Sequence, residues 1–430
     1  MNANPLRRRR SFAAAVALLL GLASAGCESL LDVTNPRFIS EDQLTQPGLE
    51  LLVVNGAVGE FQYARGYYAL YSSAMTDESF IDHTEVNIRE LTLRNILVAN
   101  TVNRDIFSNL QRARQSAEDA AVRLKEMLGD AAFAKSLNVA TVQAYGGYSY
   151  LLLGEGFCEV TVNLSAPKTP DQMFQAAAAL FDQAIATATA SGSSAAATDI
   201  INMARVGAAR AYLKLGDGAK AVTYASQVPA TYEKWAWYSA NSVRENNILN
   251  VPAGISGLWM GMGPAFQALA DPRAPKTSRT NLRGLNSNPL FPPQRPYMFS
   301  GWVGTSAVLE NLIATDTDVK LATGLEARHI IAEVNGPVAS TLAFVNERRA
   351  VGGKPAVDLT GNALMAELRT QRALDFYLTG QRLGDLRRYK AKLGIDLFPT
   401  GKFPVTNDQY GTATCFIIPQ TERNANPNIP

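Results

Sequence analysis

The 430-residue chain is long enough to bury a large hydrophobic core, either as one large domain or as two to three of ordinary size. Its 40 Lys and Arg residues nearly balance its 38 Asp and Glu residues, so the formal net charge is only +2, and charged residues make up 18% of the chain. A nucleic-acid-binding protein needs a basic face, and this balance argues against nucleic acid as a partner.

Residues 1–26 have the pattern of an export signal. Arginines at 7–10 precede an apolar run at 12–22 that is too short for a stable membrane anchor, and small residues lead up to Cys27. Two outcomes stay open: ordinary cleavage after Ala25, or lipoprotein processing that makes Cys27 the acylated first residue. Ser24 stands where lipoprotein signals favour leucine, but a cysteine at this point has an obvious use, and we expect lipidation at Cys27. Later segments lack the roughly 18 uninterrupted apolar residues of a membrane helix, so the lipid would be the attachment.

Helix is expected from about Ser40 through the apolar stretch at 49–70. In that helix Tyr63, Tyr67 and Tyr71 would lie one above another, and we interpret them as core packing. The polar stretch at 72–90 is predicted to be a solvated loop. Its acidic residues and single histidine fit neither a zinc site nor a calcium loop, so we expect no metal there: Asp77, Glu78, Asp82, His83 and Glu85.

Helical periodicity continues through residues 101–230. One helix is expected to end at Gly129-Asp130 and a second to span 131–153. Asp171 is expected to cap a third helix at 172–190, and helices at 201–215 and 219–228 would be joined by a Gly-Asp-Gly turn. Such pairs, with a comparable one at 323–333 and 338–350, resemble tetratricopeptide-type units that stack into a scaffold.

Residues 231–303 form a different kind of segment. They hold all four tryptophans and a proline-rich run at 271–296. Long irregular segments are functional or disordered, and the aromatic content argues against disorder. Aromatic rings can cover the apolar faces of a sugar while polar groups bond its hydroxyls, although core packing stays open for each ring. The candidate ligand-binding residues come from this segment and from the early polar loop: Trp235, Trp237, Tyr238, Tyr297, Trp302, His83 and Asn87.

Residues 364–388 again show helical periodicity. The leucines at 364, 368, 374 and 378 lie on one helical face, and Gly380 is predicted to end that helix. A short segment with Arg382, Asp385, Arg387 and Arg388 follows. From their chemistry alone, these charges predict a solvated helix end with local pairing between Arg and Asp.

The order of residues in this stretch carries more information than their chemistry. Residues 371–389, QRALDFYLTGQRLGDLRRY, resemble the C-terminal signature of the SusD/RagB family of nutrient-binding outer-membrane lipoproteins. Gly380, Arg382 and the run at 385–388 match, whereas Thr379 replaces the usual acidic residue. Residues 416–428, FIIPQTERNANPN, are similar to the family's terminal stretch, and residues 31–44, LDVTNPRFISEDQL, to the segment after the lipid-bearing cysteine. Asp271-Pro272-Arg273 also resembles a family element.

The resemblance implies a mainly α-helical, SusD-like fold, in which tetratricopeptide-type hairpins support an irregular, loop-rich ligand-binding segment. The export signal would occupy residues 1–26 and the SusD-like domain residues 27–430. Within that domain we expect a scaffold at about 40–230 and 304–390, the insertion at about 231–303 and an extended segment at 391–430. In the family, the loop that follows an Asp-Glu pair, here Asp77-Glu78, often contributes to the ligand surface.

The resemblance also implies a function. The protein would be lipid-anchored to the outer membrane, facing the cell surface, and would deliver an oligosaccharide or a peptide to a TonB-dependent SusC/RagA-like transporter. The alternative is a lipid-anchored helical-repeat scaffold that binds no small ligand. Exposed rings at Trp235 and Trp237 would favour sugar binding, and rings packed in the core would favour the scaffold.

Two cysteines remain after Cys27. Cys158 and Cys415 form an even pair in a chain that we expect to be exported to an oxidising compartment. We favour a disulfide between them, which would close a loop of more than half the chain. The alternative is two buried free thiols that act as small apolar side chains.

Motifs of common enzyme classes are missing from the sequence. It contains no phosphate-binding GxxxxGK[ST], no GxSxG, no HExxH and no CxxC, and its only histidines are His83 and His329. A glycosidase with two carboxylates needs no fixed motif and is the distant alternative. We therefore predict a protein that is not an enzyme and that needs no cofactor.

Overall fold

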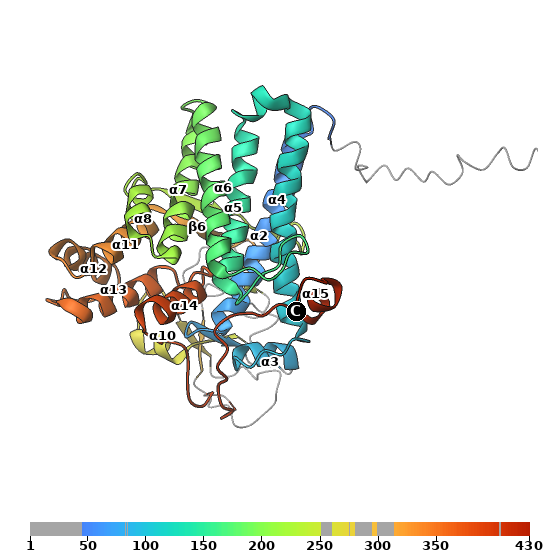
Figure 1. Ribbon diagram of the computed structural model, residues 1–430. Coiled ribbons are helices and arrows are strands. Elements are labelled where there is room, and N and C mark those ends of the chain that lie inside the picture. The colour runs from blue at the N-terminus through green and yellow to red at the C-terminus, as the bar shows by residue number, and fades with distance from the viewer. Residues whose placement is uncertain are drawn as a thin grey trace, which may run out of the picture. The chain divides into compact units, whose positions relative to one another are not determined.

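The computed structural model describes residues 45–250 apart from 82 and 84, and residues 260–274, 276–279, 295–298, 314–403 and 406–430. The predicted export signal, Cys27 and the expected helix start at Ser40 lie outside these residues. Residues 47–430 form one compact unit that is built mainly of helices (Figure 1). Among the described residues, no helix combines the length and the apolar character that crossing a membrane requires.

Long helices from the first half of the chain stand side by side in Figure 1, and shorter helices from the second half gather beside them. The first group comprises α2 (Glu50–Ala74), α4 (Thr101–Phe133), α5 (Leu137–Gly156), α6 (Pro170–Ala190) and α7 (Ala195–Leu215), and the short helix α8 (Gly218–Ala225) follows α7. The second comprises α11 (Gly324–Asn335), α12 (Ala339–Val351), α13 (Gly361–Asp375) and α14 (Arg382–Leu393). Short helices are α3 (Val86–Thr92), α10 (Pro264–Leu269) and α15 (Gln420–Ala425). Successive helices pack as antiparallel hairpins, which confirms the mainly α architecture predicted from the sequence.

Strands contribute only short antiparallel pairs in the described residues. β1 (Ser79–Ile81) pairs with β3 (Met260–Met262), β2 (Glu233–Ala236) with β6 (Val319–Thr323), and β4 (Lys276–Arg279) with β5 (Arg295–Met298). The first two pairs join segments that are distant in sequence and tie the insertion to the rest of the fold, whereas β4 and β5 both lie within the insertion.

Helix ends follow local capping chemistry, with two corrections to the sequence prediction. The first is at α6, which begins at Pro170 after a capping box between Thr169 and Gln172, so Asp171 lies in the first turn instead of capping the helix. The second concerns the helix predicted at 131–153: α4 breaks at Gly129 (φ 69°, ψ 166°), where the stop was predicted, but a short helical piece continues to Phe133, and α5 starts only at Leu137. The predicted stop at Gly216 holds, because this residue takes the left-handed conformation that glycine allows.

The stretch at 72–90, predicted to be a solvated loop, is instead largely ordered and buried. Helix α2 continues to Ala74, β1 follows, and Glu78 is only 1% exposed. The carboxylate of Glu85 caps α3 by accepting hydrogen bonds from the backbone N–H groups of Asn87 and Ile88. The stretch is polar because its side chains have specific partners in the fold.

The tyrosine ladder on α2 forms as predicted. The ring centroids of Tyr63 and Tyr67 are 5.1 Å apart, and those of Tyr67 and Tyr71 are 6.0 Å apart. Only Tyr71 is buried, whereas Tyr63 and Tyr67 are half-buried. The ladder therefore runs from the core toward the surface, and its Tyr63 end is accessible.

The charges of the 364–388 stretch are buried in the core, which overturns the prediction of a solvated helix end. Asp385 accepts hydrogen bonds from Arg372 Nε (2.6 Å) and Lys214 Nζ (2.9 Å), and Lys214 also lies 3.1 Å from the carboxylate of Glu155. Burial alone would raise the pKa of Asp385, but the neighbouring cations Arg372 and Lys214 hold it well below its usual range. The predicted local pairing of Arg and Asp is present between Arg372 and Asp385, but the predicted solvation is wrong, because Lys214 of α7 and Glu155 of α5, far away in sequence, join this pair in the core.

The remaining arginines of this stretch have different roles. Arg388 pairs with Glu333 of α11 at 2.7 Å. Arg387 donates to the backbone carbonyls of Gly154 and Glu155 at the end of α5 (2.9 and 2.7 Å), and burial lowers its pKa to about 10. The signature therefore joins α14 to both groups of helices.

Asp375 forms a second buried charge cluster at the root of the insertion. It accepts hydrogen bonds from Arg273 Nη1 (2.8 Å), Arg348 Nη2 (2.7 Å) and the ring of His329 (2.7 Å), while Asp271 pairs with Arg273. Burial would raise the pKa of Asp375, but the hydrogen bonds from His329 and Arg348 bring it well below its usual range. The Asp-Pro-Arg element thus anchors the insertion to α11, α12 and α13.

Cys158 and Cys415 form a disulfide across a sequence separation of 257 residues. The bridge joins the end of α5 to the C-terminal segment, where Phe157 and Phe416 form a parallel bridge and pack their rings 5.4 Å apart. The favoured pairing of these cysteines is therefore present, and it fastens the C-terminal segment to the scaffold.

Candidate functional site

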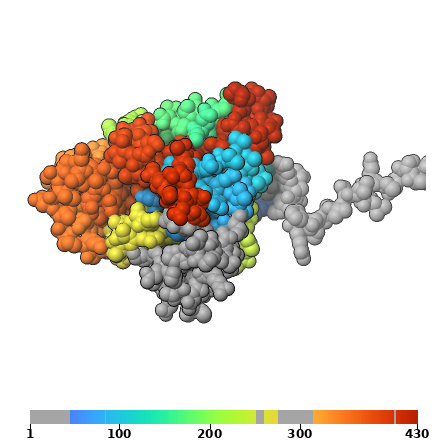
Figure 2. Space-filling view, turned by 90° about the horizontal axis from the view of Figure 1, so that it is seen from below, coloured from blue at the N-terminus to red at the C-terminus, as the bar shows by residue number. Residues whose placement is uncertain are grey.

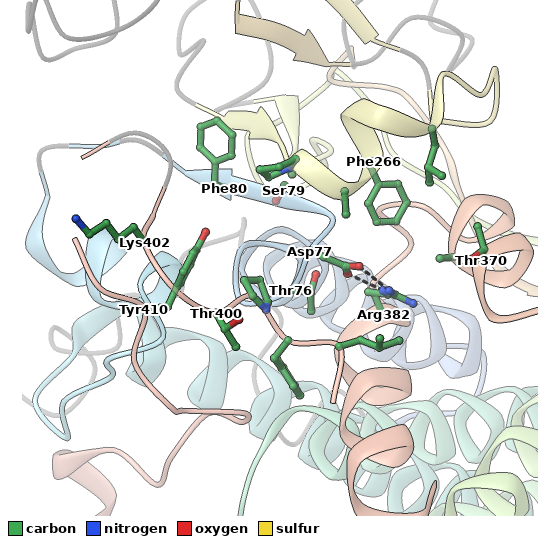
Figure 3. Close-up of a pocket in the computed structure, with 18 residues that line it drawn as sticks. Thr76, Asp77, Ser79, Phe80, Phe266, Thr370, Arg382, Thr400, Lys402 and Tyr410 are labelled. Carbon is green, nitrogen blue, oxygen red and sulfur yellow. Dashed lines mark hydrogen bonds and ion pairs between the residues drawn. The ribbon is translucent and has the colours of Figure 1, made fainter. Parts of the chain in front are cut away.

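Four segments that are distant in sequence surround a hollow of about 590 Å³ (Figure 3). They are residues 76–80 at the start of β1, residues 263–269 around α10, residues 370–382 of α13 and the following turn, and the C-terminal segment 397–410. Figure 2 shows these blue, yellow, orange and red parts of the chain meeting on one face. We call this cavity the Asp77 hollow. Its size is typical of small-molecule sites, which span roughly 300–1,000 Å³.

An ion pair lies in the middle of the Asp77 hollow. The guanidinium of Arg382 faces the carboxylate of Asp77 in a two-pronged contact, with Nε 2.7 Å from Oδ1 and Nη2 2.6 Å from Oδ2 (Figure 3). Burial would lower the pKa of Arg382, but the Asp77 carboxylate more than offsets this and keeps the guanidinium charged. Both side chains are largely buried, so they present a fixed pair of donor and acceptor edges to a ligand.

Glu78 holds the strand behind this pair. Its Oε1 accepts a hydrogen bond from the backbone N–H of Leu378 (2.8 Å), and its carbonyl accepts one from the hydroxyl of Tyr377 (3.1 Å). Burial raises the pKa of Glu78 to about 8. The loop between α13 and α14 thus fixes the position of Asp77 by binding its neighbour.

Aromatic side chains form the walls of the Asp77 hollow. Phe266 packs against Tyr377 with ring centroids 4.7 Å apart, and the guanidinium of Arg94 lies 4.7 Å from the ring centre of Phe398. Tyr410 is half-buried at the rim. These contacts fix the walls before any ligand arrives.

Exposed and polar groups complete the rim. Lys402 and Thr400 are exposed on the C-terminal segment, and Figure 3 shows them on the same side as Tyr410, opposite Thr370. The hollow therefore combines apolar walls with hydroxyl groups, an ammonium and a buried ion pair. That mixture suits a hydroxylated ligand with apolar faces.

Gly263 makes the close approach between two of these segments possible. Its N–H donates to the carbonyl of Glu78 (2.8 Å), and a Cβ at this position would lie 1.8 Å from the carbonyl oxygen of Asp77. Only glycine lets α10 come this near to β1.

A second hollow of about 350 Å³ lies along α2, next to the loop that follows β2. Its lining includes Gln62, Tyr63, Trp237, Tyr238 and Arg244. Trp237 is 62% exposed, and Arg244 lies over the ring of Tyr63 at 4.7 Å. We call it the Trp237 hollow.

The predicted ligand-binding residues are therefore not all in one place. Trp237 and Tyr238 line the Trp237 hollow, whereas Trp235 sits on β2 half-buried with the ammonium of Lys320 5.2 Å from its ring centre. Within the described part of the chain, His83 and Asn87 line neither hollow.

Two further predicted residues remain without a described side chain. Tyr297 lies in β5, where the structure describes only the backbone, and Trp302 lies outside the described residues. Their predicted ligand contacts stay predictions.

Sequence reasoning missed Asp77 and Arg382 as site residues. Both belong to stretches that the sequence analysis singled out, Asp77 to the polar stretch at 72–90 and Arg382 to the signature at 371–389. Their local chemistry predicted solvated charges, because their pairing depends on a contact across 305 residues of sequence. Among the described residues, no group of three or more His, Cys, Asp or Glu is placed to hold a metal ion.

Comparison with known proteins agrees with this architecture. No family model and no curated protein matches the sequence. Among solved structures, a SusD superfamily protein from Parabacteroides distasonis has a TM-score of 0.67 at 15% identity, covering 91% of this chain and 99% of its own. A SusD superfamily protein from Bacteroides vulgatus has a TM-score of 0.67 at 15% identity, covering 89% of this chain and 98% of its own. A SusD-like carbohydrate binding protein from Bacteroides vulgatus has a TM-score of 0.64 at 13% identity, covering 89% of this chain and 97% of its own. The chain therefore has the mainly α-helical SusD-like fold that its sequence signature predicts.

Proposed function

We propose that this protein captures an oligosaccharide in the Asp77 hollow and does not transform it. The observation that carries the proposal is the make-up of that hollow, in which aromatic walls enclose the two-pronged pair of Asp77 and Arg382. A sugar ring has apolar C–H faces that pack on aromatic walls, while its hydroxyls can donate to a carboxylate and accept from a guanidinium. A structure with the same fold is named as a carbohydrate binding protein, which supports this ligand class.

The pairing of Asp77 with Arg382 favours a neutral ligand. Each charge already has its counter-charge, so a charged ligand would have to compete with that contact. Hydroxyl groups can instead bond the outer edges of both side chains without separating them.

We further propose that Cys27 carries the lipid that holds the protein at the outer-membrane surface. From there it would hand its ligand to a TonB-dependent SusC/RagA-like transporter. The support for this step is the leader sequence together with the SusD-like fold. Mass spectrometry of the processed protein tests it: acyl chains on an N-terminal Cys27 are expected, and an unmodified N-terminus would contradict the anchor.

Isothermal calorimetry on the chain from Glu28 tests ligand capture. The panel would hold neutral oligosaccharides (malto-, cello-, xylo- and mannohexaose) and tetrapeptides. We expect one sugar class to bind and the Tyr410→Ala/Lys402→Ala variant to bind it at least tenfold more weakly, because both changes remove rim contacts. Lys392→Ala, another exposed lysine outside the hollow, is the control and should bind as the wild type does. If a peptide binds and no sugar does, the ligand is a peptide and the proposed oligosaccharide is wrong. If the double variant binds with wild-type affinity, the binding site is not the Asp77 hollow.

A further inference from the structure

We propose that the Trp237 hollow is a second carbohydrate-binding site, separate from the Asp77 hollow. The ligand class rests on the proposed function, whereas the site itself rests on its own geometry. The hollow of about 350 Å³ falls in the size range of small-molecule sites.

Trp237 supplies an exposed flat ring in a fixed position. It is 62% exposed, although tryptophan is usually highly buried. Trp237 directly follows β2, which pairs with β6. The backbone N–H of the next residue, Tyr238, donates a hydrogen bond to Asp318 Oδ1 (2.8 Å). The backbone on both sides of the ring is therefore tied down, and ordering this platform for a ligand costs little entropy.

Arg244 and Tyr63, which also line the hollow, form a second flat surface. The guanidinium of Arg244 lies 4.7 Å from the centre of the Tyr63 ring and pairs with Glu60 of α2. Tyr63 is in turn packed against Tyr67, the next member of the ladder. The charge of Arg244 is matched by Glu60, so the surface favours a neutral ligand over an anion.

Hydrogen-bonding groups share the lining of this hollow with the two surfaces. Gln62, Ser239, Ser242 and Glu245 line the hollow. The loop that carries three of them is braced by its own bonds, from Ser239 N–H to the Glu245 carbonyl (2.9 Å) and from Ser242 Oγ to Glu245 Oε1 (2.9 Å). The flat Trp237 ring can pack against the apolar face of a sugar ring, and the hydroxyl, amide and carboxylate groups of the lining can bond its hydroxyls.

The two hollows are too far apart to be one site for a single sugar ring. Tyr63 lies in the middle of α2, and the Asp77 hollow begins just beyond its end at Ala74. At about 1.5 Å per residue, the helix spans roughly 16 Å between Tyr63 and Ala74. A second site at this distance would raise the affinity for long chains over short ones if both engage the same molecule.

Fluorine NMR on the chain from Glu28, labelled with 5-fluorotryptophan, reads the Trp237 hollow directly. The Trp237 signal is assigned from its loss in Trp237→Phe, and the same neutral hexaose panel is titrated in. We expect a saturable shift of that signal with the sugar that the protein binds. Arg244→Ala should weaken the response at least fivefold, while Val243→Ala, an 83% exposed neighbour outside the lining, should leave it unchanged.

The outcomes separate this site from the proposed function. If the shift survives in Tyr410→Ala/Lys402→Ala, the Trp237 hollow binds on its own, as proposed. If calorimetry detects a bound sugar while the Trp237 signal stays still, the second site is refuted and the Asp77 hollow stands. If no sugar binds at either hollow, carbohydrate capture fails as a whole, and the second site fails with it.

Discussion

Replacing Asp385 by Asn should strongly destabilise the protein. The change keeps the shape of the side chain but removes the negative charge that faces Arg372 and Lys214, both with only 2% of their side chains exposed. Glu155 is then the only carboxylate left within ion-pair distance of Lys214 among the described residues, and Arg372 loses its closest counter-charge. Breaking a buried ion pair by removing one partner costs about 3–5 kcal/mol, a large part of the roughly 5–15 kcal/mol that stabilises a typical protein.

Urea unfolding followed by circular dichroism measures this free energy of unfolding. Glu347→Gln is the matched control, because Glu347 pairs with Arg328 at the surface and such pairs contribute only about 0–1 kcal/mol. Adding Arg372→Met to Asp385→Asn removes the cation that has lost its closest counter-charge and should recover part of the loss, by about 0.5–3 kcal/mol of coupling. A loss below about 1 kcal/mol in Asp385→Asn, equal to that of the control, would refute the claim that the signature charges hold the core together.

Three further changes test other parts of the structure. The stability of Glu78→Gln relative to the wild type should rise between about pH 5 and pH 8. The reason is that the Glu78 carboxyl keeps its proton up to about pH 8 in the folded protein but loses it near pH 4.5 in the unfolded chain, so only the wild type loses stability over this range. A difference in urea midpoints that does not change with pH would contradict this. Gly263→Ala should lower the free energy of unfolding by about 1–3 kcal/mol, because the added methyl group would clash with the backbone carbonyl of Asp77. The control Gly56→Ala has open space around it in α2 and should raise the free energy of unfolding by about 0.5–1 kcal/mol. Serine at both Cys158 and Cys415 should lower the free energy of unfolding by at most about 5 kcal/mol, and alkylation of both cysteines in the unreduced wild type, seen by mass spectrometry, would show that the bridge is absent.

The helices were predictable from the sequence because their signals are local. Leucine spacing, caps and glycine stops placed the end of α7 at Gly216, but the helix predicted to run to Gly380 already ends at Asp375, and Leu378 lies in the following turn with a φ of 58°. The break at Gly129 was predicted correctly, but the start of the next helix was not, because a short helical piece continues to Phe133 and α5 begins only at Leu137. The SusD-like fold followed from the order of residues in the signature, and physical reasoning about those residues alone did not give it.

The candidate site was only partly predictable, because it depends on contacts between distant segments. The residues next to Asp77 and Arg382 in the sequence predict that both charges are solvated. The two side chains pair only because the fold brings the start of β1 next to the start of α14. Trp237 and Tyr238 were singled out because a long irregular segment rich in aromatic residues is uncommon, although the sequence left open whether each ring is exposed. His83 carried no such signal beyond its place in a polar loop.

The most direct test of the central claim is a crystal structure of the chain from Glu28 with the tightest-binding oligosaccharide of the panel. We predict a sugar ring in the Asp77 hollow, with hydroxyls within hydrogen-bonding distance of Asp77 and Arg382 and with an apolar face against Tyr410. A ligand bound only outside this hollow, with the hollow filled by solvent, would contradict the account.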